Sequence, residues 1–432
     1  MNNAQNLADR IAAGDIAATA CVRGIVKLRS NNLIERPWGG LRMLEYKGCA
    51  PLPDQKKITG MGLGEAFEIA ACPSDPESEA HPSIACLSDG SEIALPQLLH
   101  HAGRNILGKP LFERFHGEIP LLPKTLDIEE LLSVQAHPPG NTELYVIIDA
   151  QPGASIRLGF RHNVDPDSLR RELIEGRKKQ NDLLQLLRAD VDHNQLHNTL
   201  APALASRDDD LQDLIETLKP LLADDADVAA VHQCLLTLRA VYWHVLDLMN
   251  EVAVRPGQII HNATPARVCR VAGIAPSAEV HALGNPDRRE ILMLEIRRPG
   301  KTFRAWDHVR FPIRDIEIDQ ALSALHCGAT SPEEFEVTPK PLSGAPGVFR
   351  SVKSDSFIVD HIRPEKDRIM SIAGKHFHTL HLIHGSVVLI ENTGNTTKLT
   401  TGESAIVPAT VDAYQVAADA SAELIRVNLP SR

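Results

Sequence analysis

The stretch LLSVQAHPPGNTELYVII, residues 131–148, carries three side chains that could bind a metal ion. Gln135 and His137 alternate with apolar residues, so in a β-strand both side chains point to the same face. The Pro-Pro-Gly turn that follows predicts a reversal into a second strand, which begins near Glu143. Such a hairpin brings together one amide, one imidazole and one carboxylate, one ligand short of a four-coordinate site.

The elements that must position these residues change type along the chain. Residues 3–29 have the apolar spacing of a helical extension, and from about Pro37 short apolar runs alternate with turns, which predicts antiparallel β structure. Between Asp165 and Asn250 the apolar spacing is that of amphipathic helices. Strand patterns return after Arg255, in RPGQIIHNA, ARVCRVAG, SAEVHALG and EILMLEIRR, and the Pro/Gly-rich stretch 338–347 predicts a linker before a final block of short strands.

Composition narrows the class of protein. A chain of 432 residues with 43% hydrophobic and 23% charged residues is long enough for two or three domains. The net charge of -11, without a long basic run, argues against nucleic acid as a partner. Seven scattered cysteines without a C-x-x-C pair favour free thiols, and neither a signal peptide nor an apolar membrane span is evident. We therefore expect a cytoplasmic protein without membrane partners.

A fourth metal ligand must come from another part of the chain. The best candidate is His281 in GIAPSAEVHALGN, whose pattern resembles the second cupin motif, with Ala278 where that motif usually has glycine. In the cupin pattern an earlier strand pair supplies two or three ligands and this later strand supplies the last histidine. The resemblance implies a small β-barrel that holds the ion in its mouth.

Longer blocks resemble the type I mannose-6-phosphate isomerase (phosphomannose isomerase) family. In order along residues 33–310 they are ERPWGG, GLGEAFEIA, PLLPKTLDIEELLSVQAHP, TELYVIIDAQPGA, VHALG and LEIRRPGKTFRAWDHVR, with a weaker similarity at GESAIVPA. The resemblance implies a mainly β fold with an α insertion: two cupin-type (jelly-roll) β-barrel units plus a helical domain. The expected parts are an N-terminal helical extension (1–30), a discontinuous catalytic cupin barrel (31–164 and 251–335), the helical insert (165–250) and a C-terminal cupin-like domain (345–432).

The same resemblance implies a function. One Zn²⁺ per chain would be held by Gln135, His137, Glu143 and His281, and the protein, as a monomer or homodimer, would interconvert mannose 6-phosphate and fructose 6-phosphate through a cis-enediol. Arg304 aligns with the family's active-site arginine, whose guanidinium could hold an enediolate or a phosphate. Lys124 aligns with a lysine beside the metal and suits a phosphosugar substrate.

Plainer roles are open for the two cations. Lys124 could be a surface lysine at a sheet edge, and Arg304 could form a structural salt bridge with Asp307 or Glu295. Arg310 is expected to face solvent.

One departure from the family pattern bears on catalysis. Many members have a basic residue shortly before the ligand glutamate, whereas this chain has Gly140, Asn141 and Thr142. Asparagine can donate a hydrogen bond but cannot act as a base. The loop between His137 and Glu143 is also short.

An alternative function therefore stays open: a metal-binding cupin that binds or senses a sugar without efficient catalysis, or that acts on a different phosphosugar. An Fe²⁺ oxygenase is less favoured, because its site would hold more histidines.

The C-terminal run KHFHTLHLIHG contains a second group of histidines. His376 and His378 form an H-x-H pair, which is half of a cupin metal motif. No carboxylate follows at the usual offset, and strand alternation would place His381 and His384 on different faces. We expect core or surface histidines here rather than a second metal site.

Overall fold

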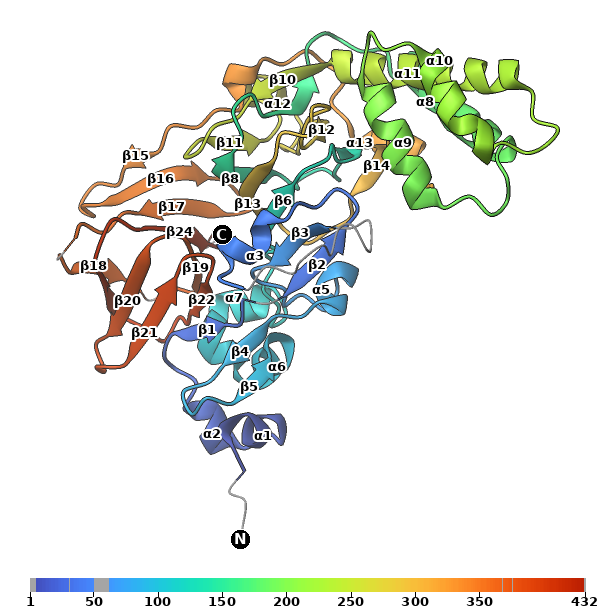
Figure 1. The fold of residues 1–432 in the computed structure, drawn as a ribbon. Helices are drawn as coiled ribbons and strands as arrows, with labels where there is room; N and C mark the ends of the chain where they lie inside the picture. The colour runs from blue at the N-terminus through green and yellow to red at the C-terminus, as the bar shows by residue number, and fades with distance from the viewer. Residues whose placement is uncertain (1–4, 31, 50–61, 367, 375, 431–432) are drawn as a thin grey trace.

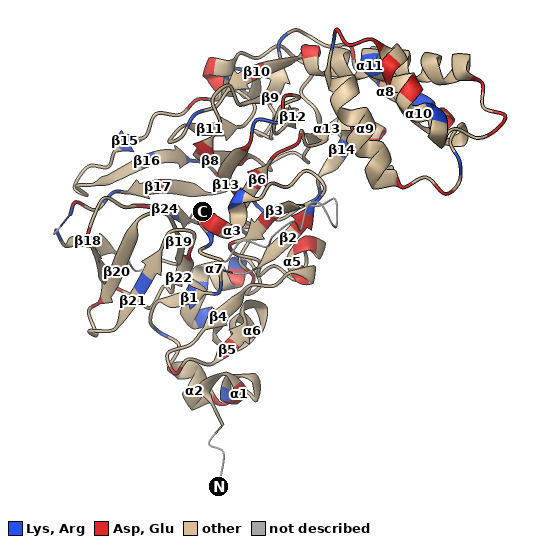
Figure 2. Ribbon diagram, viewed as in Figure 1, with Lys and Arg blue, Asp and Glu red and all other residues tan. Residues whose placement is uncertain are grey.

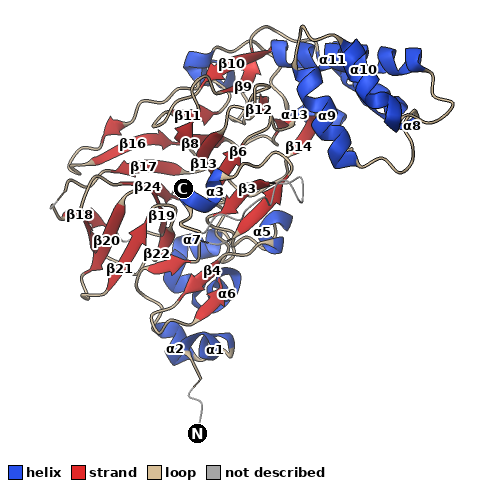
Figure 3. Cartoon of the chain, viewed as in Figure 1, coloured by secondary structure: helices blue, strands red, loops and turns tan. Residues whose placement is uncertain are grey.

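The computed structural model of the chain describes residues 5–30, 32–49, 62–366, 368–374 and 376–430. The first four residues of the predicted helical extension lie outside this part. The fold is mainly β, with several antiparallel sheets and a group of helices inserted between strands β9 and β10. Figure 1 shows these inserted helices at one end of the molecule, and Figure 3 shows that most of the strands lie outside them.

Two antiparallel sheets enclose the first core. One sheet has the order β11-β8-β13-β6-β3-β2. Its strands are β11 (Ile259–Asn262), β8 (Glu143–Ala150), β13 (Ile291–Ile296), β6 (Lys124–Ile128), β3 (Gly62–Phe67) and β2 (Leu33–Arg36). The other sheet has the order β10-β9-β12-β7-β14, formed by β10 (Met249–Ala253), β9 (Ser155–Phe160), β12 (His281–Ala282), β7 (Val134–Ala136) and β14 (Phe303–Trp306).

Strand alternation decides which side chains fill the space between these two sheets. On β8, Tyr145 and Ile147 belong to the core between the sheets, whereas Leu144 and Val146 belong to the core on the other side of β8. On β7, Val134 and Ala136 pack toward the helical insert. Because neighbours in a strand point to opposite faces, Gln135 points into the space between the sheets.

The inserted helices follow the predicted spacing. They are α8 (Pro166–Gln185), α9 (His193–Ala205), α10 (Leu211–Leu218), the 3₁₀ helix η1 (Lys219–Leu221) and α11 (Val228–Leu248). Four of the α-helices begin at an aspartate whose side chain accepts hydrogen bonds from the first turn: Asp165, Asp192, Asp210 and Asp227. Their leucines pack on the outer face of the five-stranded sheet, so the insert covers the back of β7, β12 and β14.

The C-terminal strands form a second pair of sheets. The larger has the order β15-β16-β17-β24-β19-β22-β1-β4-β5, and the smaller has the order β18-β23-β20-β21. Their bounds are β15 (Lys340–Pro341), β16 (Val348–Lys353), β17 (Ile358–Ile362), β24 (Glu423–Asn428), β19 (His378–His384), β22 (Ser404–Val407), β1 (Val26–Leu28), β4 (Ile84–Cys86), β5 (Glu92–Ala94), β18 (Met370–Ala373), β23 (Ala413–Ala418), β20 (Ser386–Glu391) and β21 (Thr396–Thr400).

Three of these strands come from the N-terminal quarter of the chain, which the sequence did not predict. β1 pairs with β22 on one side and with β4 on the other, so the C-terminal sheet is completed by residues that precede the metal-site strands. The remaining helices are α1 (Leu7–Ala12), α2 (Ile16–Ala20), α3 (Arg42–Tyr46), α5 (Pro76–Ala80), α6 (Leu95–Leu107), α7 (Lys109–Arg114), α12 (Ala266–Ala272), α13 (Ile318–Ala324) and the 3₁₀ helix η2 (Pro332–Glu334).

One predicted strand is wrong. ARVCRVAG forms helix α12, which begins after Pro265 and ends at Gly273 in the left-handed conformation. The β-branched valines favoured a strand, but proline before the first turn and glycine after the last are helix boundary signals. Among the described helices, none combines the length and apolar character needed to cross a membrane.

Candidate metal centre and active-site cavity

His137, Glu143 and His281 meet between the two sheets of the first core. Nε2 of His137 lies 2.8 Å from one carboxylate oxygen of Glu143, and Nε2 of His281 lies 3.4 Å from the other. The two imidazole rings are stacked with their centres 5.3 Å apart. Within the described part of the chain, these three form the one group of His, Cys, Asp or Glu side chains whose ligand atoms are close enough to share an ion.

The turn between β7 and β8 makes this approach possible. Gly140 adopts a positive φ of 88°, and the backbone N–H of Asn141 donates to the carbonyl of Pro138 at 3.2 Å. The chain reverses within this turn, which brings Glu143, the first residue of β8, back to His137. β12 is paired with β7, and His281 lies directly opposite Gln135 in that pair.

Backbone carbonyls orient both imidazoles. Nδ1 of His281 donates to the carbonyl of Glu279 at 2.9 Å, and Nδ1 of His137 donates to the carbonyl of Lys301 at 3.4 Å. With the proton on Nδ1, each Nε2 presents its lone pair toward Glu143. Metal-binding histidines commonly have this arrangement, because the second ring nitrogen is fixed by a hydrogen bond.

The three residues fit a divalent metal ion. Nε2 of His137 is buried without a hydrogen-bond partner among the described residues, although the carboxylate is 2.8 Å away. Burial lowers the pKa of His281, which favours the neutral imidazole that a metal requires. For Glu143 burial acts to raise the pKa, but interaction with His137 and His281 lowers it overall, so the carboxylate is ionised. Imidazole nitrogen and carboxylate oxygen are ligands that zinc accepts.

Gln135 lies two residues before His137 on β7, directly opposite His281 of β12. In the sheet its Cα is paired with those of His281 and Arg304, so the three side chains project from the same face. Its amide nitrogen donates to the hydroxyl of Ser133 at 3.1 Å. This bond leaves the amide oxygen as the atom that could reach an ion.

Tyr145 and Asn262 support the cluster, and the sequence did not single them out. The Tyr145 hydroxyl donates to the carboxylate of Glu143, and it accepts a hydrogen bond from the Asn262 amide at 3.0 Å. Both residues are buried. Alternation along ELYVII places Tyr145 on the same face as Glu143. The sequence therefore contained a signal for Tyr145, but the same pattern is equally typical of an ordinary core tyrosine.

A cavity of about 400 Å³ adjoins Gln135 and Glu143. Its volume lies in the range of sites for small molecules. Charged side chains of both signs line it: Glu35, Arg36, Glu65, Glu77, Lys124, Glu143, Glu295, Arg297, Arg304 and Arg314.

Lys124 and Arg304 both line this cavity. Lys124 is buried on β6, where its ammonium group lies 2.8 Å from Glu77, so it is not a surface lysine. Arg304 donates from Nη1 to the carbonyl of Asp315 at 2.8 Å, while its Nε is buried without a hydrogen-bond partner in the described part of the chain. Asp307, the partner considered for Arg304, is instead held by Arg314.

Glu295 is a further cavity residue that the sequence did not single out as catalytic. It lies on β13 opposite Lys124 and Tyr145. Burial and the charge of Glu143 raise the pKa of Glu295 to about 8, although Arg297 and Lys124 act in the opposite direction. A carboxyl group with such a pKa can hold a proton near neutral pH, as a general acid or base must.

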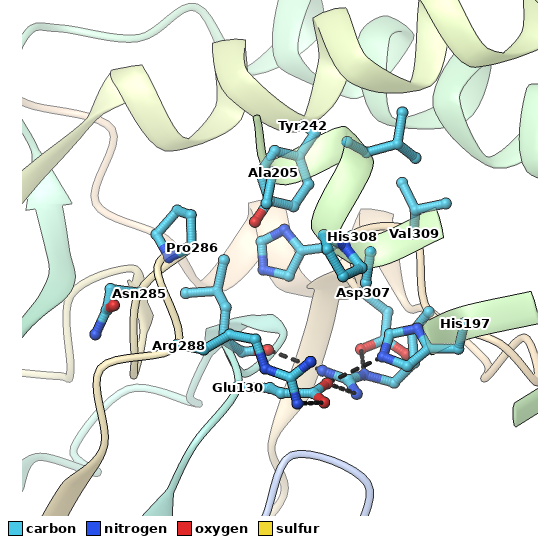
Figure 4. A pocket seen from close by; sticks show the side chains of 15 residues that line it. Glu130, His197, Ala205, Tyr242, Asn285, Pro286, Arg288, Asp307, His308 and Val309 are labelled. Carbon is cyan, nitrogen blue, oxygen red and sulfur yellow. Dashed lines mark hydrogen bonds and ion pairs between the residues drawn. The ribbon is translucent and has the colours of Figure 1, made fainter. Parts of the chain in front are cut away.

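Arg310 does not face solvent, so that prediction is wrong. Its side chain is 4% exposed and lies in a small cavity of about 50 Å³ between helices α9 and α11 and the segment that precedes β7. Figure 4 shows Glu130 at the centre of a set of charged contacts there. Arg288, His197 and Arg310 reach its carboxylate at 2.7, 3.0 and 3.4 Å. The carboxylates of Glu130 and Asp307, the latter 3.6 Å from Nε of Arg310, balance the charge of this buried arginine.

The C-terminal histidines occupy ordinary positions. Nε2 of His378 lies 3.0 Å from the hydroxyl of Tyr414, and His381 lies between Thr379 and Ser404. Both are buried in β19, and His384 is exposed at its end.

Comparison with known proteins agrees with this site. Residues 76–153, which include Gln135, His137 and Glu143, match the family model described as phosphomannose isomerase type I, catalytic domain. The resemblance to type I phosphomannose isomerases is therefore confirmed. No curated protein matches the sequence.

Solved structures show that the fold is shared with this family. Mannose 6-phosphate isomerase from Bacillus subtilis is 18% identical with a TM-score of 0.60, over 94% of this chain and 100% of that one. A mutant of phosphomannose isomerase from Salmonella typhimurium is 17% identical with a TM-score of 0.59, over 94% and 99%. A mannose 6-phosphate isomerase bound with zinc and yttrium is 18% identical with a TM-score of 0.59, over 94% and 99%.

Proposed function

We propose that this protein is a zinc-dependent aldose–ketose isomerase that interconverts mannose 6-phosphate and fructose 6-phosphate through a cis-enediol. The observation that carries the proposal is the buried group of His137, Glu143 and His281 beside a charged cavity of about 400 Å³. The family match over residues 76–153 and the zinc-bound structural relative support the same reading. Gln135 is proposed as the fourth protein ligand of one Zn²⁺ per chain, inside a cupin-type barrel formed by the first two sheets.

When bound, the zinc ion would act as a Lewis acid toward the sugar oxygens at C1 and C2. The chain's own residues supply the other functions. Arg304 presents a permanently charged guanidinium to the cavity, where it would hold an enediolate oxygen. Lys124 provides a buried positive charge for the anionic end of the substrate.

We propose that Glu295 carries the proton between C1 and C2. Position 141, where many family members have a basic residue, is asparagine and cannot do so. Glu295 lies in the same cavity as Glu143 and Arg304, and its carboxyl has a pKa of about 8. The missing lysine therefore does not by itself remove the acid–base chemistry.

The second candidate function is a metal-binding protein that binds a phosphosugar without efficient turnover. Asn141 and the short turn to Glu143 are the observations that favour it. In both cases we propose a cytoplasmic location and a phosphosugar partner.

A coupled assay decides between the two candidates. Zinc-loaded protein is given mannose 6-phosphate, and fructose 6-phosphate formation is followed with and without a chelator. We expect turnover that is lost on chelation and restored by zinc, and no turnover of mannose. If zinc-loaded protein binds mannose 6-phosphate but shows no turnover, the second candidate is correct.

A further inference from the structure

Glu77 places a carboxylate on the positively charged side of the active-site cavity. It comes from α5, and it lies 2.8 Å from Nζ of Lys124 and 3.2 Å from Nη2 of Arg297. Arg36 approaches it at 3.9 Å. Figure 2 shows the acidic residues of α5 beside β2, the strand that carries Arg36. One carboxylate thus faces three cations that line the same cavity.

The partners of Glu77 are buried, but Glu77 itself is not. The side chains of Lys124 and Arg297 are 3% and 5% exposed, whereas that of Glu77 is 46% exposed. The other carboxylates near these cations, Glu65 and Glu295, are 11% and 9% exposed. Glu77 is therefore the carboxylate that can turn into water without being transferred from a buried environment.

The helix that carries Glu77 is anchored independently of it. The Asp75 side chain accepts hydrogen bonds from the backbone N–H groups of Ser78 and Gly300 at 3.0 Å, and the Ser78 hydroxyl accepts from the N–H of Cys72 at 2.9 Å. Rotation of the Glu77 side chain breaks none of these bonds. The movement needed is a change of side-chain rotamer, which is fast for exposed residues.

Charge balance indicates what could replace Glu77. When its carboxylate turns away, Lys124 and Arg297 lose their shared and closest counter-ion. Within the described part of the chain, Lys124 then keeps only the carboxylate of Glu65, at 3.6 Å and shared with Arg36. Arg297 keeps only that of Glu295 there, at 3.4 Å. Two buried cations without that counter-ion match a phosphate monoester, which carries a charge of about -1.5 to -2 at neutral pH. Although burial acts to raise it, the charges of Lys124 and Arg297 lower the pKa of Glu77 to about 2, so its carboxylate is ionised and repels an anion in the same place.

We propose that Glu77 is a displaceable counter-ion, which exchanges with the anionic group of an incoming ligand at Lys124 and Arg297. The proposal deepens the proposed function, and it rests on that function for the identity of the ligand as a phosphosugar. A ligand without an anionic group cannot replace Glu77 at these two cations. Because every anion must displace Glu77, all anions would bind more weakly than they would without it. Tight binding would then require a group with two negative charges.

The test measures the binding of inorganic phosphate by calorimetry to the zinc-loaded wild type, E77Q and E79Q. Glu79 lies on the same short helix and is exposed, so E79Q is matched in charge and position. We expect E77Q to bind phosphate roughly fivefold more tightly than the wild type, and E79Q to bind within about twofold. The gain should be lost when Lys124→Met is combined with E77Q.

Equal or weaker phosphate binding by E77Q than by E79Q overturns the proposal, as does the absence of phosphate binding in all three proteins. Thermal melting shows whether each variant is folded, and an E77Q protein that does not fold also overturns it, because Glu77 would then be structural. Phosphate binding requires no turnover, so the result is separate from the isomerase assay. If the wild type turns over mannose 6-phosphate, E77Q should also lower KM more than it changes kcat.

Discussion

At the residue scale, Glu143 connects the metal site to the rest of the molecule. Two imidazoles approach its oxygens, and the Tyr145 hydroxyl donates to it from the adjacent core.

Most of this site could be predicted from local sequence. Alternation in the sequence could place Gln135 and His137 on one face, and the Pro-Pro-Gly turn could bring Glu143 back to them. His281 could not be placed by local pattern, because its strand joins β7 only through sheet pairing. Glu295 was missed because one charged residue in an apolar strand has no local signal of function.

Glu143→Gln should weaken zinc binding by about tenfold or more, because an amide is a poorer ligand than a carboxylate and no longer balances the charge of the ion. The measurement is competition with a chromophoric chelator, together with metal content after dialysis. The rise in melting temperature produced by zinc should fall with the affinity. Glu251→Gln on β10, an exposed carboxylate, is the control. Unchanged metal content in Glu143→Gln would contradict the ligand assignment.

Tyr145→Phe removes the hydroxyl that orients Glu143 and leaves the ring in the core. Residues that orient metal ligands typically contribute 10- to 100-fold to metal affinity, so we expect a loss of about tenfold in zinc affinity. Tyr242→Phe, in the buried part of the helical insert, is the matched control and should bind zinc as the wild type does. If both variants bind zinc equally, the Tyr145 hydroxyl has no part in the site.

Arg304→Ala should leave zinc bound while kcat falls roughly 100-fold, because a donor to the developing oxyanion is removed but no metal ligand is. Steady-state kinetics and metal content are measured on the same preparation. Arg267→Ala, which removes an exposed arginine paired with Glu334, serves for comparison. Retained activity in Arg304→Ala would remove this residue from the catalytic set.

At the element scale, the segment that precedes β7 is fixed from several sides. Arg310 donates to the carbonyl of Leu131 and His308 to that of Leu132, both at 2.8 Å. His308 and Arg288 have positive φ angles of 52° and 57°, and both contact this segment or its carboxylates. Backbone strain at two residues that hold the same segment suggests that the position of β7 is tightly specified. The sequence predicted β7 as a strand but gave no signal of these contacts, which depend on folded geometry.

Glu130→Gln should therefore lower the free energy of unfolding by about 2 kcal/mol, because buried Arg310 loses one of its two carboxylate partners among the described residues and keeps only Asp307, at 3.6 Å. Urea denaturation is the measurement. Glu175→Gln on α8 removes a partly exposed carboxylate from a surface ion pair and should change stability by less than about 1 kcal/mol. A Glu130→Gln protein as stable as Glu175→Gln would show that this set of charges does not stabilise the fold.

At the scale of the whole molecule, buried polar residues connect sheets that lie far apart in the sequence. Glu68, just after β3, contacts Lys47 and accepts a hydrogen bond at 2.7 Å from Ser404 of the C-terminal sheet. His381 in turn lies 2.9 Å from the Ser404 hydroxyl.

Local patterns predicted the order of β and α regions along the chain. They did not predict which strands share a sheet, because β1, β4 and β5 join the C-terminal sheet through strand pairing alone. The cupin assignment and the domain boundaries stay predictions.

Three buried histidines make the stability of the molecule depend on pH. Burial lowers the pKa of His308 and His381 to about 4 and that of His378 to about 3. In the unfolded chain each would bind a proton below a pH of about 6.5. At these three residues the unfolded state therefore binds more protons between about pH 6.5 and 4, so their contribution to stability is fully present above this window and is lost as the pH falls through it. Near pH 5.5 these three histidines contribute roughly 4 kcal/mol per pH unit to the slope. His261, whose pKa burial lowers to about 4, adds to it, whereas Asp127 and Glu295, whose pKa values burial raises to about 7 and about 8, contribute in the opposite direction.

Urea denaturation at intervals from pH 7.5 to 5 measures this slope. His378→Gln can keep a hydrogen bond to Tyr414 but cannot bind the proton, so the slope should fall by roughly one proton, or about 1 kcal/mol per pH unit. His232→Gln, at an exposed position of α11, is the control for the loss of an imidazole. If His378→Gln and the wild type lose stability in parallel, His378 is protonated in the folded protein and the acid sensitivity must come from other groups.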